Sequence, residues 1–127
     1  MTTQIAHLYA TGCLAIVFFQ VALIAGLPLG VYTQGGQVEG ALPLKGRIVA
    51  AVSILILIFQ GLAIVSAAGF PGLDWPRWTG WAATGVSFVG FVLNWITQSR
   101  QERALWGPIM TVMLALALYV MVLTTWG

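Results

Sequence analysis

The sequence predicts an all-α protein, a bundle of four transmembrane helices, and its composition gives the two main reasons. The chain of 127 residues is 60% hydrophobic and only 6% charged, whereas soluble domains carry roughly 25% charged residues. Its five basic and three acidic side chains all lie between four apolar runs. Each run is long enough to cross a hydrocarbon core of about 30 Å as a helix of about 20 residues. We therefore expect a single integral membrane domain over residues 1–127.

The four predicted helices follow from these runs and from the residues that flank them. We place them at about residues 5–27, 48–68, 78–96 and 104–126. A lipid-facing sheet would have to close into a barrel of shorter, alternating strands, so helices are the spanning structure that fits. Pro28 and Pro71 follow the first two runs in a shared Ala-Gly-x-Pro pattern, and proline cannot continue a helix. Ser99, with Glu102 three residues later, has the pattern of a cap before the fourth helix.

The segment Gly26–Arg47, called the first loop here, is the longest stretch that cannot itself be buried in lipid. Gly35, Gly36 and Gly40 suit tight turns, because glycine reaches positive φ without steric cost. Residues 27–33 are too apolar for a freely solvated linker. We expect a re-entrant or interface-lying loop folded over the mouth of the bundle. It lacks the Gly-Lys-Ser/Thr of a phosphate loop, so nucleotide binding is excluded.

The charged residues predict how the chain is oriented. With four spans, the first and third loops share one side, and both termini share the other with the second loop. Arg77 alone marks the second side, whereas the first side holds Lys45, Arg47, Arg100 and Arg103. Cytoplasmic loops carry the excess of Lys and Arg. We therefore expect a multi-pass protein of the bacterial inner (cytoplasmic) membrane, with the first and third loops in the cytoplasm and both termini outside.

The aromatic residues are expected in two belts at headgroup level, where an apolar ring and a polar edge are both satisfied. The inner belt would hold Tyr32, Trp95 and Trp106. The outer belt would hold Tyr9, Trp75, Trp78, Trp81, Tyr119 and Trp126.

The third run has a face of small and polar residues that favours close packing. Steps of three or four place the following on one side of a helix: Gly80, Ala83, Ser87, Gly90 and Asn94. Small residues at this spacing let helix backbones approach closely in lipid. We expect this packing face at the centre of the bundle.

Polar side chains inside the runs allow two interpretations. They are Gln20, Ser53, Ser87 and Asn94. They could hold the helices together through hydrogen bonds, and Gln20 and Ser53 lie at depths that would let them bond each other. Alternatively, they could line a polar vestibule that opens between the first and third loops. A charged rim above it would consist of Glu39, Arg47, Arg100, Glu102 and Arg103.

The arginines of this rim also have two interpretations. They would either anchor the helix ends to lipid headgroups or bind an anionic lipid or ligand. Together with the four polar residues of the runs, the rim completes the set of candidate binding residues.

Other chemistries find little support in the sequence. There is one histidine, His7, and one cysteine, Cys13, so paired haem ligation within the chain is excluded and we expect no metal and no cofactor. No carboxylate lies within a run, which argues against a proton-coupled exporter. No basic patch is long enough for nucleic acid. No catalytic set can be assembled, so an enzyme is unsupported.

Two motifs carry a resemblance. The first, AGLPLG–GGQ–G–LP–R-I-x-A-x-S, covers Ala25–Ser53, and the second, N-x-x-x-x-S-x-x-E-R-x-x-W-x-P, covers Asn94–Pro108. In them the chain resembles a widespread, uncharacterised group of small bacterial four-span membrane proteins. The group shares the Gly-rich first loop, a Leu-Pro before a basic residue, and an Asn/Ser/Glu cluster before the last helix. The basic residue is displaced here to Lys45. The resemblance implies the topology and adds no reaction.

Three functions therefore stay open. The first is a small, non-enzymatic inner-membrane protein that binds membrane lipid or a partner membrane subunit through its first and third loops. The second is a small channel or transporter that acts as a homo-oligomer, because four short helices enclose little volume. The third, an enzyme acting on lipid headgroups, rests only on Glu39, Glu102 and the arginines.

Overall fold

The predicted fold class is confirmed. The structure, a computed structural model, describes all 127 residues as a bundle of four long helices without strands. The long helices are α1 (Thr2–Ile24), α2 (Leu44–Ala67), α3 (Arg77–Ile96) and α4 (Arg100–Trp126). Two short 3₁₀ helices, η1 (Gly30–Tyr32) and η2 (Gln34–Gly36), lie in the first loop.

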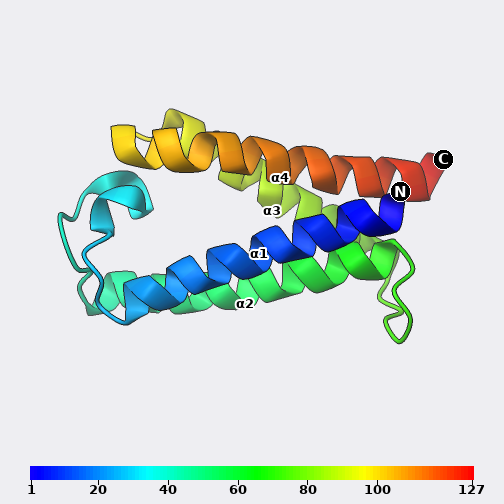
Figure 1. Cartoon of the computed structure of the whole chain (residues 1–127), viewed down its shortest axis with the longest axis horizontal. Coiled ribbons are helices and arrows are strands. Elements are labelled where there is room, and N and C mark those ends of the chain that lie inside the picture. The colour runs from blue at the N-terminus through cyan, green and yellow to red at the C-terminus, as the bar shows by residue number, and fades with distance from the viewer.

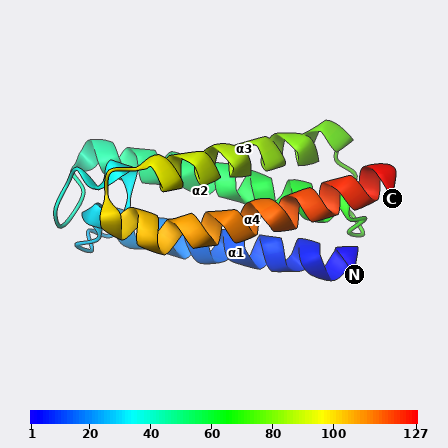
Figure 2. The same ribbon diagram turned by 90° about the horizontal axis from the view of Figure 1, so that it is seen from above.

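Successive helices run antiparallel and form a four-membered ring (Figures 1 and 2). Helix α1 packs against α2 and α4, and α3 packs against the same two helices. The two termini and the second loop lie at one end of the bundle, and the first loop and the α3–α4 junction lie at the other (Figure 1). We call these the terminal end and the loop end.

Three helices, α1, α2 and α4, are long and apolar enough to cross a membrane. Helix α3 is not among them, because its small and polar residues lower its hydropathy. It has 20 residues, which still extend about 30 Å at 1.5 Å per residue. The fourth span stays a prediction.

Helices α1 and α2 end in the same way, and glycine rather than proline sets their ends. Gly26 and Gly69 have φ of 93° and 91°. The next N–H reaches back five residues in each case: Leu27 N donates to Ala22 O and Phe70 N to Val65 O, both at 3.1 Å. This is the Schellman motif, in which a left-handed glycine closes the last turn. Helix α1 therefore ends at Ile24, before the predicted limit at residue 27.

The apolar core occupies the terminal half of the bundle. All four helices contribute, and its members are Ala6, Tyr9, Cys13, Ile16, Ala63, Ile64, Val65, Ala83, Met113, Ala117, Val120 and Met121. A smaller cluster of Leu23, Leu42 and Ala50 lies at the loop end. Tyr9 is fully buried, so its predicted place in the outer aromatic belt is wrong. The reason is a polar partner inside the bundle, described below.

The small-residue face of α3 divides into two parts. Towards the terminal end Gly80, Ala83 and Ser87 are buried, and a Cβ added to Gly80 would overlap the sulfur of Met121. Towards the loop end, Gly90 and Asn94 are only half-buried. There the helices separate and the interior becomes polar.

One side chain ties the helices at the terminal end. Arg77 Nη1 donates to the hydroxyls of Thr124 and Thr125, both at 2.9 Å, and its Nη2 donates to the carbonyl of Ala67 at 3.4 Å. Arg77 begins α3, the two threonines lie in the last turn of α4, and Ala67 ends α2. Three helices are thereby joined at one point.

Candidate functional site

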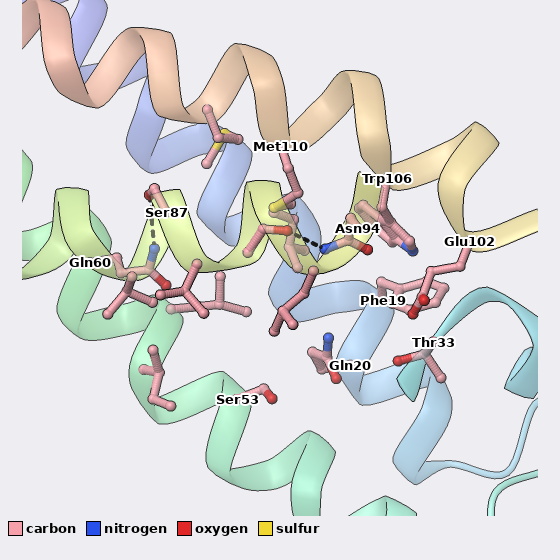
Figure 3. Close-up of a pocket in the computed structure, with 18 of the residues that line it drawn as sticks. Phe19, Gln20, Thr33, Ser53, Gln60, Ser87, Asn94, Glu102, Trp106 and Met110 are labelled. Atoms are coloured by element: carbon pink, nitrogen blue, oxygen red, sulfur yellow. Dashed lines mark hydrogen bonds between the residues drawn. The ribbon is translucent and has the colours of Figure 1, made fainter. Parts of the chain in front are cut away.

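A cavity of about 390 Å³ lies in the loop half of the bundle, between all four helices and the first loop. Gln20 of α1, Ser53 of α2, and Ser87 and Asn94 of α3 all line it (Figure 3). These are the four polar residues of the predicted vestibule. The structure thus brings all four to one cavity.

The cavity opens sideways between α2 and α3. Four apolar residues that line it also lie on the outer surface of these helices, namely Ile56, Val86, Val89 and Leu93. Each of the four is between 39% and 56% exposed. An apolar, outward-facing mouth of this kind would meet lipid chains in a membrane.

The inner end of the cavity is closed by three polar side chains from three helices. The hydroxyls of Tyr9 and Ser87 lie 2.5 Å apart. Gln60 Nε2 donates to both hydroxyls, at 3.0 Å to Tyr9 and 3.2 Å to Ser87. This Tyr9–Gln60–Ser87 cluster is buried, and the apolar core continues directly from it.

Sequence reasoning assigned neither Tyr9 nor Gln60 to the site. A tyrosine near a helix end is typical of headgroup level, which hid the role of Tyr9. The available signal was Gln60 itself, because a glutamine deep within an apolar run needs a partner.

Two of the polar side chains that line the cavity bond to their own helices. Asn94 Nδ2 donates to Gly90 O at 2.7 Å, and Ser53 Oγ donates to Val49 O at 2.9 Å. Ser53 and Gln20, whose depths would let them bond each other, both line the cavity but make no hydrogen bond to each other. Their oxygen lone pairs stay open to the cavity.

Glu102 lies at the loop end of the cavity and is only 7% exposed. Ser99 caps α4 as predicted, since its Oγ accepts a hydrogen bond from Glu102 N at 3.1 Å. The Glu102 carboxylate does not complete the cap by returning to Ser99. It accepts instead from Gly35 N, with 3.4 Å between Oε2 and N.

The first loop covers this end of the bundle and is held there by the start of α4. Ser99 Oγ donates to Val31 O at 2.6 Å, and Trp106 Nε1 donates to Tyr32 O at 2.8 Å. The Trp106 ring also packs edge-on against Phe19, with 4.8 Å between centroids. The loop segment 32–34 thereby lines the cavity.

The predicted charged rim is not gathered around the cavity. Of its five members only Glu102 lines the cavity. Glu39 and Arg100 are exposed. Arg47 Nε donates to Leu42 O, and Arg103 Nη1 donates to Thr97 O, both at 2.8 Å. The two arginines satisfy backbone carbonyls at the helix starts, so they do not supply a basic lining for an anionic ligand.

Neither a metal centre nor a known relative indicates what the protein does. No group of three His, Cys, Asp or Glu residues that could hold a metal ion is present. No family model, no curated protein and no solved structure matches the chain. Its function is therefore argued from the cavity itself.

Proposed function

We propose that this protein is a multi-pass protein of the bacterial inner membrane that binds a membrane lipid without transforming it. Four helices cross the bilayer, with the loop end in the cytoplasm. The charge distribution supports this orientation, because the first turns of α2 and α4 carry Lys45, Arg47, Arg100 and Arg103 at the loop end. Helix α3 is the fourth span, since it lies alongside three helices of membrane-crossing length.

The observation that carries the proposal is the sideways-opening cavity. Its volume of about 390 Å³ falls in the range of ligand sites, roughly 300–1,000 Å³. Its mouth between α2 and α3 is apolar, and its loop end holds the polar groups of Gln20, Asn94 and Glu102. A lipid entering from the bilayer would place its chain against the apolar wall and its head under the first loop.

The depth of these groups agrees with a lipid lying in the cytoplasmic leaflet. The polar end is covered by the first loop and by the start of α4, next to the basic helix starts. A headgroup there stays at its own level in the bilayer, so binding requires no deep insertion of a polar group. The first and third loops then act together, the first as cover and the third by positioning Glu102.

Flux through a single chain is disfavoured by the closed inner end. The Tyr9–Gln60–Ser87 cluster and the core behind it fill the path towards the terminal end. A partner subunit at the same mouth is the competing occupant, and the experiment below separates the two.

The test is native mass spectrometry of the protein extracted in mild detergent with bilayer lipid. We expect about one lipid retained per chain. The variant Ser53→Phe fills the cavity from α2 and should lose this lipid, because Ser53 lines the cavity and bonds only within its helix. Its neighbour Val52 is half exposed and does not line the cavity, so Val52→Phe should retain it. Circular dichroism checks that both variants stay helical.

Two results would contradict the proposal. One is a wild-type protein that carries no lipid but co-purifies with a stoichiometric second subunit. The other is equal lipid retention in Ser53→Phe and Val52→Phe, which would place the lipid outside the cavity.

A further inference from the structure

The polar end of the cavity has an imbalance between hydrogen-bond donors and acceptors. One N–H of the Asn94 amide and the hydroxyl of Ser53 donate to carbonyls of their own helices. The Trp106 N–H is used by Tyr32 O. The amide oxygen of Asn94 accepts no hydrogen bond from the chain, and it has two lone pairs, whereas only one N–H of the same amide is left free. The cavity therefore presents acceptors in excess.

Two side chains that line the cavity, those of Gln20 and Thr33, can either donate or accept a hydrogen bond. Gln20 makes no hydrogen bond to the chain, and neither does the Thr33 hydroxyl. Both groups combine donor and acceptor atoms. They adapt to a ligand and do not by themselves decide its chemistry.

Glu102 determines which charge a ligand at the polar end of the cavity should carry. It is 7% exposed and is the one charged residue that lines the cavity. Its carboxylate has one partner in the chain, the Gly35 N–H at a long 3.4 Å. The two arginines that lie nearest to Glu102 in the sequence do not neutralise its carboxylate, because Arg103 donates to Thr97 O and Arg100 is exposed. A buried carboxylate without an opposite charge is unfavourable unless a cation reaches it.

These two observations define one class of ligand. We propose that the polar end selects a protonated primary amine, and that the bound molecule is a lipid with an ammonium headgroup. The inference rests on the proposed lipid binding and names its substrate class. The ammonium would pair with Glu102, and its N–H groups would donate to the free oxygens around it. Figure 3 shows Glu102, Gln20 and Asn94 facing the same space.

This reverses the interpretation favoured by the arginines alone. Their guanidinium groups lie outside the cavity, whereas an acid lies inside it. An anionic headgroup such as a glycerol phosphodiester would bring its phosphate towards Glu102 with few free donors to receive it. A quaternary ammonium would match the charge, but it has no N–H to donate to the acceptor oxygens.

The experiment uses nanodiscs that contain the whole protein with equal parts of phosphatidylethanolamine, phosphatidylglycerol and phosphatidylcholine of identical chains. Native mass spectrometry then reports the lipid retained by each variant. We expect phosphatidylethanolamine to be enriched on the order of tenfold, about 1.4 kcal/mol, because hydrogen bonds to a charged group are the stronger ones.

Two variants separate headgroup selection from binding itself. Glu102→Gln keeps an oxygen for the Gly35 N–H and keeps the backbone cap at Ser99, so it should hold lipid with the enrichment lost. Glu39→Gln removes an exposed acid of the first loop and should keep the enrichment.

A last arm identifies the source of the amine. Ethanolamine added to nanodiscs of phosphatidylglycerol alone should leave the retained lipid unchanged if the ammonium must come with a lipid chain. Displacement of lipid by ethanolamine in the wild type, absent from Glu102→Gln, would support the amine chemistry but assign it to a soluble ligand and overturn the lipid source. Retained lipid without headgroup preference, or with phosphatidylglycerol preferred, overturns this inference and leaves lipid binding standing. A wild-type protein with no retained lipid overturns both.

Discussion

The Glu102 carboxylate accepts a hydrogen bond from the backbone N–H of Gly35, at 3.4 Å, and so joins the first turn of α4 to the first loop. The contact closes the loop end of the cavity between residues 67 positions apart in the sequence. It also leaves the carboxylate turned towards the cavity and not towards its own helix cap.

Replacing Glu102 should loosen the first loop in a manner that depends on the substituent. In Glu102→Ala the Gly35 N–H loses its acceptor, which costs about 0.5–1.5 kcal/mol and speeds amide exchange of η2 by up to about tenfold. Glu102→Gln keeps an acceptor oxygen and should exchange nearly as the wild type does. Hydrogen–deuterium exchange of residues 30–36 measures this, and identical exchange in the two variants would show that the contact does not hold the loop.

The glycines of the first loop should differ in their tolerance of a side chain. Gly36 and Gly40 both have positive φ, at 67° and 80°. A Cβ on Gly36 would overlap Ser99, whereas a Cβ on Gly40 meets nothing within 4 Å. We expect Gly40→Ala to cost about 1–2 kcal/mol for the left-handed backbone alone, and Gly36→Ala to cost about 1–3 kcal/mol more from overpacking.

Thermal unfolding in detergent compares the two glycine variants directly. Because both substitutions carry the same backbone penalty, the difference between their midpoints isolates the Ser99 contact. Equal midpoints would mean that the loop does not rest on the start of α4.

Removing the Ser99 hydroxyl should destabilise the protein more than removing the Ser53 hydroxyl. Ser99 caps α4 and also donates to Val31 O, and loss of a helix cap costs about 0.5–2 kcal/mol. Ser53 bonds only to a carbonyl of its own helix, so Ser53→Ala should change stability by less than about 0.5 kcal/mol. A Ser99→Ala midpoint equal to that of Ser53→Ala would contradict the capping role.

The Tyr9–Gln60–Ser87 cluster should behave as a coupled unit. In a double-mutant cycle of Tyr9→Phe and Gln60→Met we expect a coupling energy of about 0.6 kcal/mol, the average for hydrogen bonds between membrane helices. Tyr119 is 38% exposed and makes no side-chain hydrogen bond, so a cycle of Tyr119→Phe with Gln60→Met should show none. If the changes in the free energy of unfolding are additive in the first cycle, the Tyr9–Gln60–Ser87 cluster does not couple the helices.

Two glycines of α3 should respond to alanine in opposite directions. A Cβ on Gly80 would lie 2.5 Å from Met121 Sδ, whereas a Cβ on Gly85 meets nothing within 4 Å. Gly80→Ala should therefore lower stability by about 1 kcal/mol, because Met121 is fully buried and the flexible end of its side chain has to shift. Gly85→Ala should raise it by about 0.5–1 kcal/mol, because alanine favours the helix. Unfolding midpoints of the same sign would show that α3 does not pack closely there.

Composition and polarity predicted the helices and the lining of the cavity because both follow from one rule. Charged side chains stay out of hydrocarbon, and polar ones such as Gln20 and Asn94 turn inward. The same rule misplaced Tyr9, because an amphipathic ring satisfies headgroup level and a buried partner equally well. Only the three-dimensional pairing with Gln60 and Ser87 decides between them.

The contacts of the first loop were beyond prediction for a different reason. Glycine content shows where the backbone can turn, but it does not show which distant residue meets the turn. Ser99 and Glu102 formed a recognisable capping pattern, yet half of that pattern is diverted to Gly35. A local rule identifies the residues at such a site, and long-range packing decides which partners they use.

The Arg77 contacts have a mechanical consequence. Because this side chain joins the ends of α2 and α4 to the start of α3, the helices are held together at the terminal end of the bundle. If the gap between α2 and α3 widens, the helices therefore separate most at the loop end. Entry of a ligand into the cavity would then move the helix ends at the loop end more than those at the terminal end.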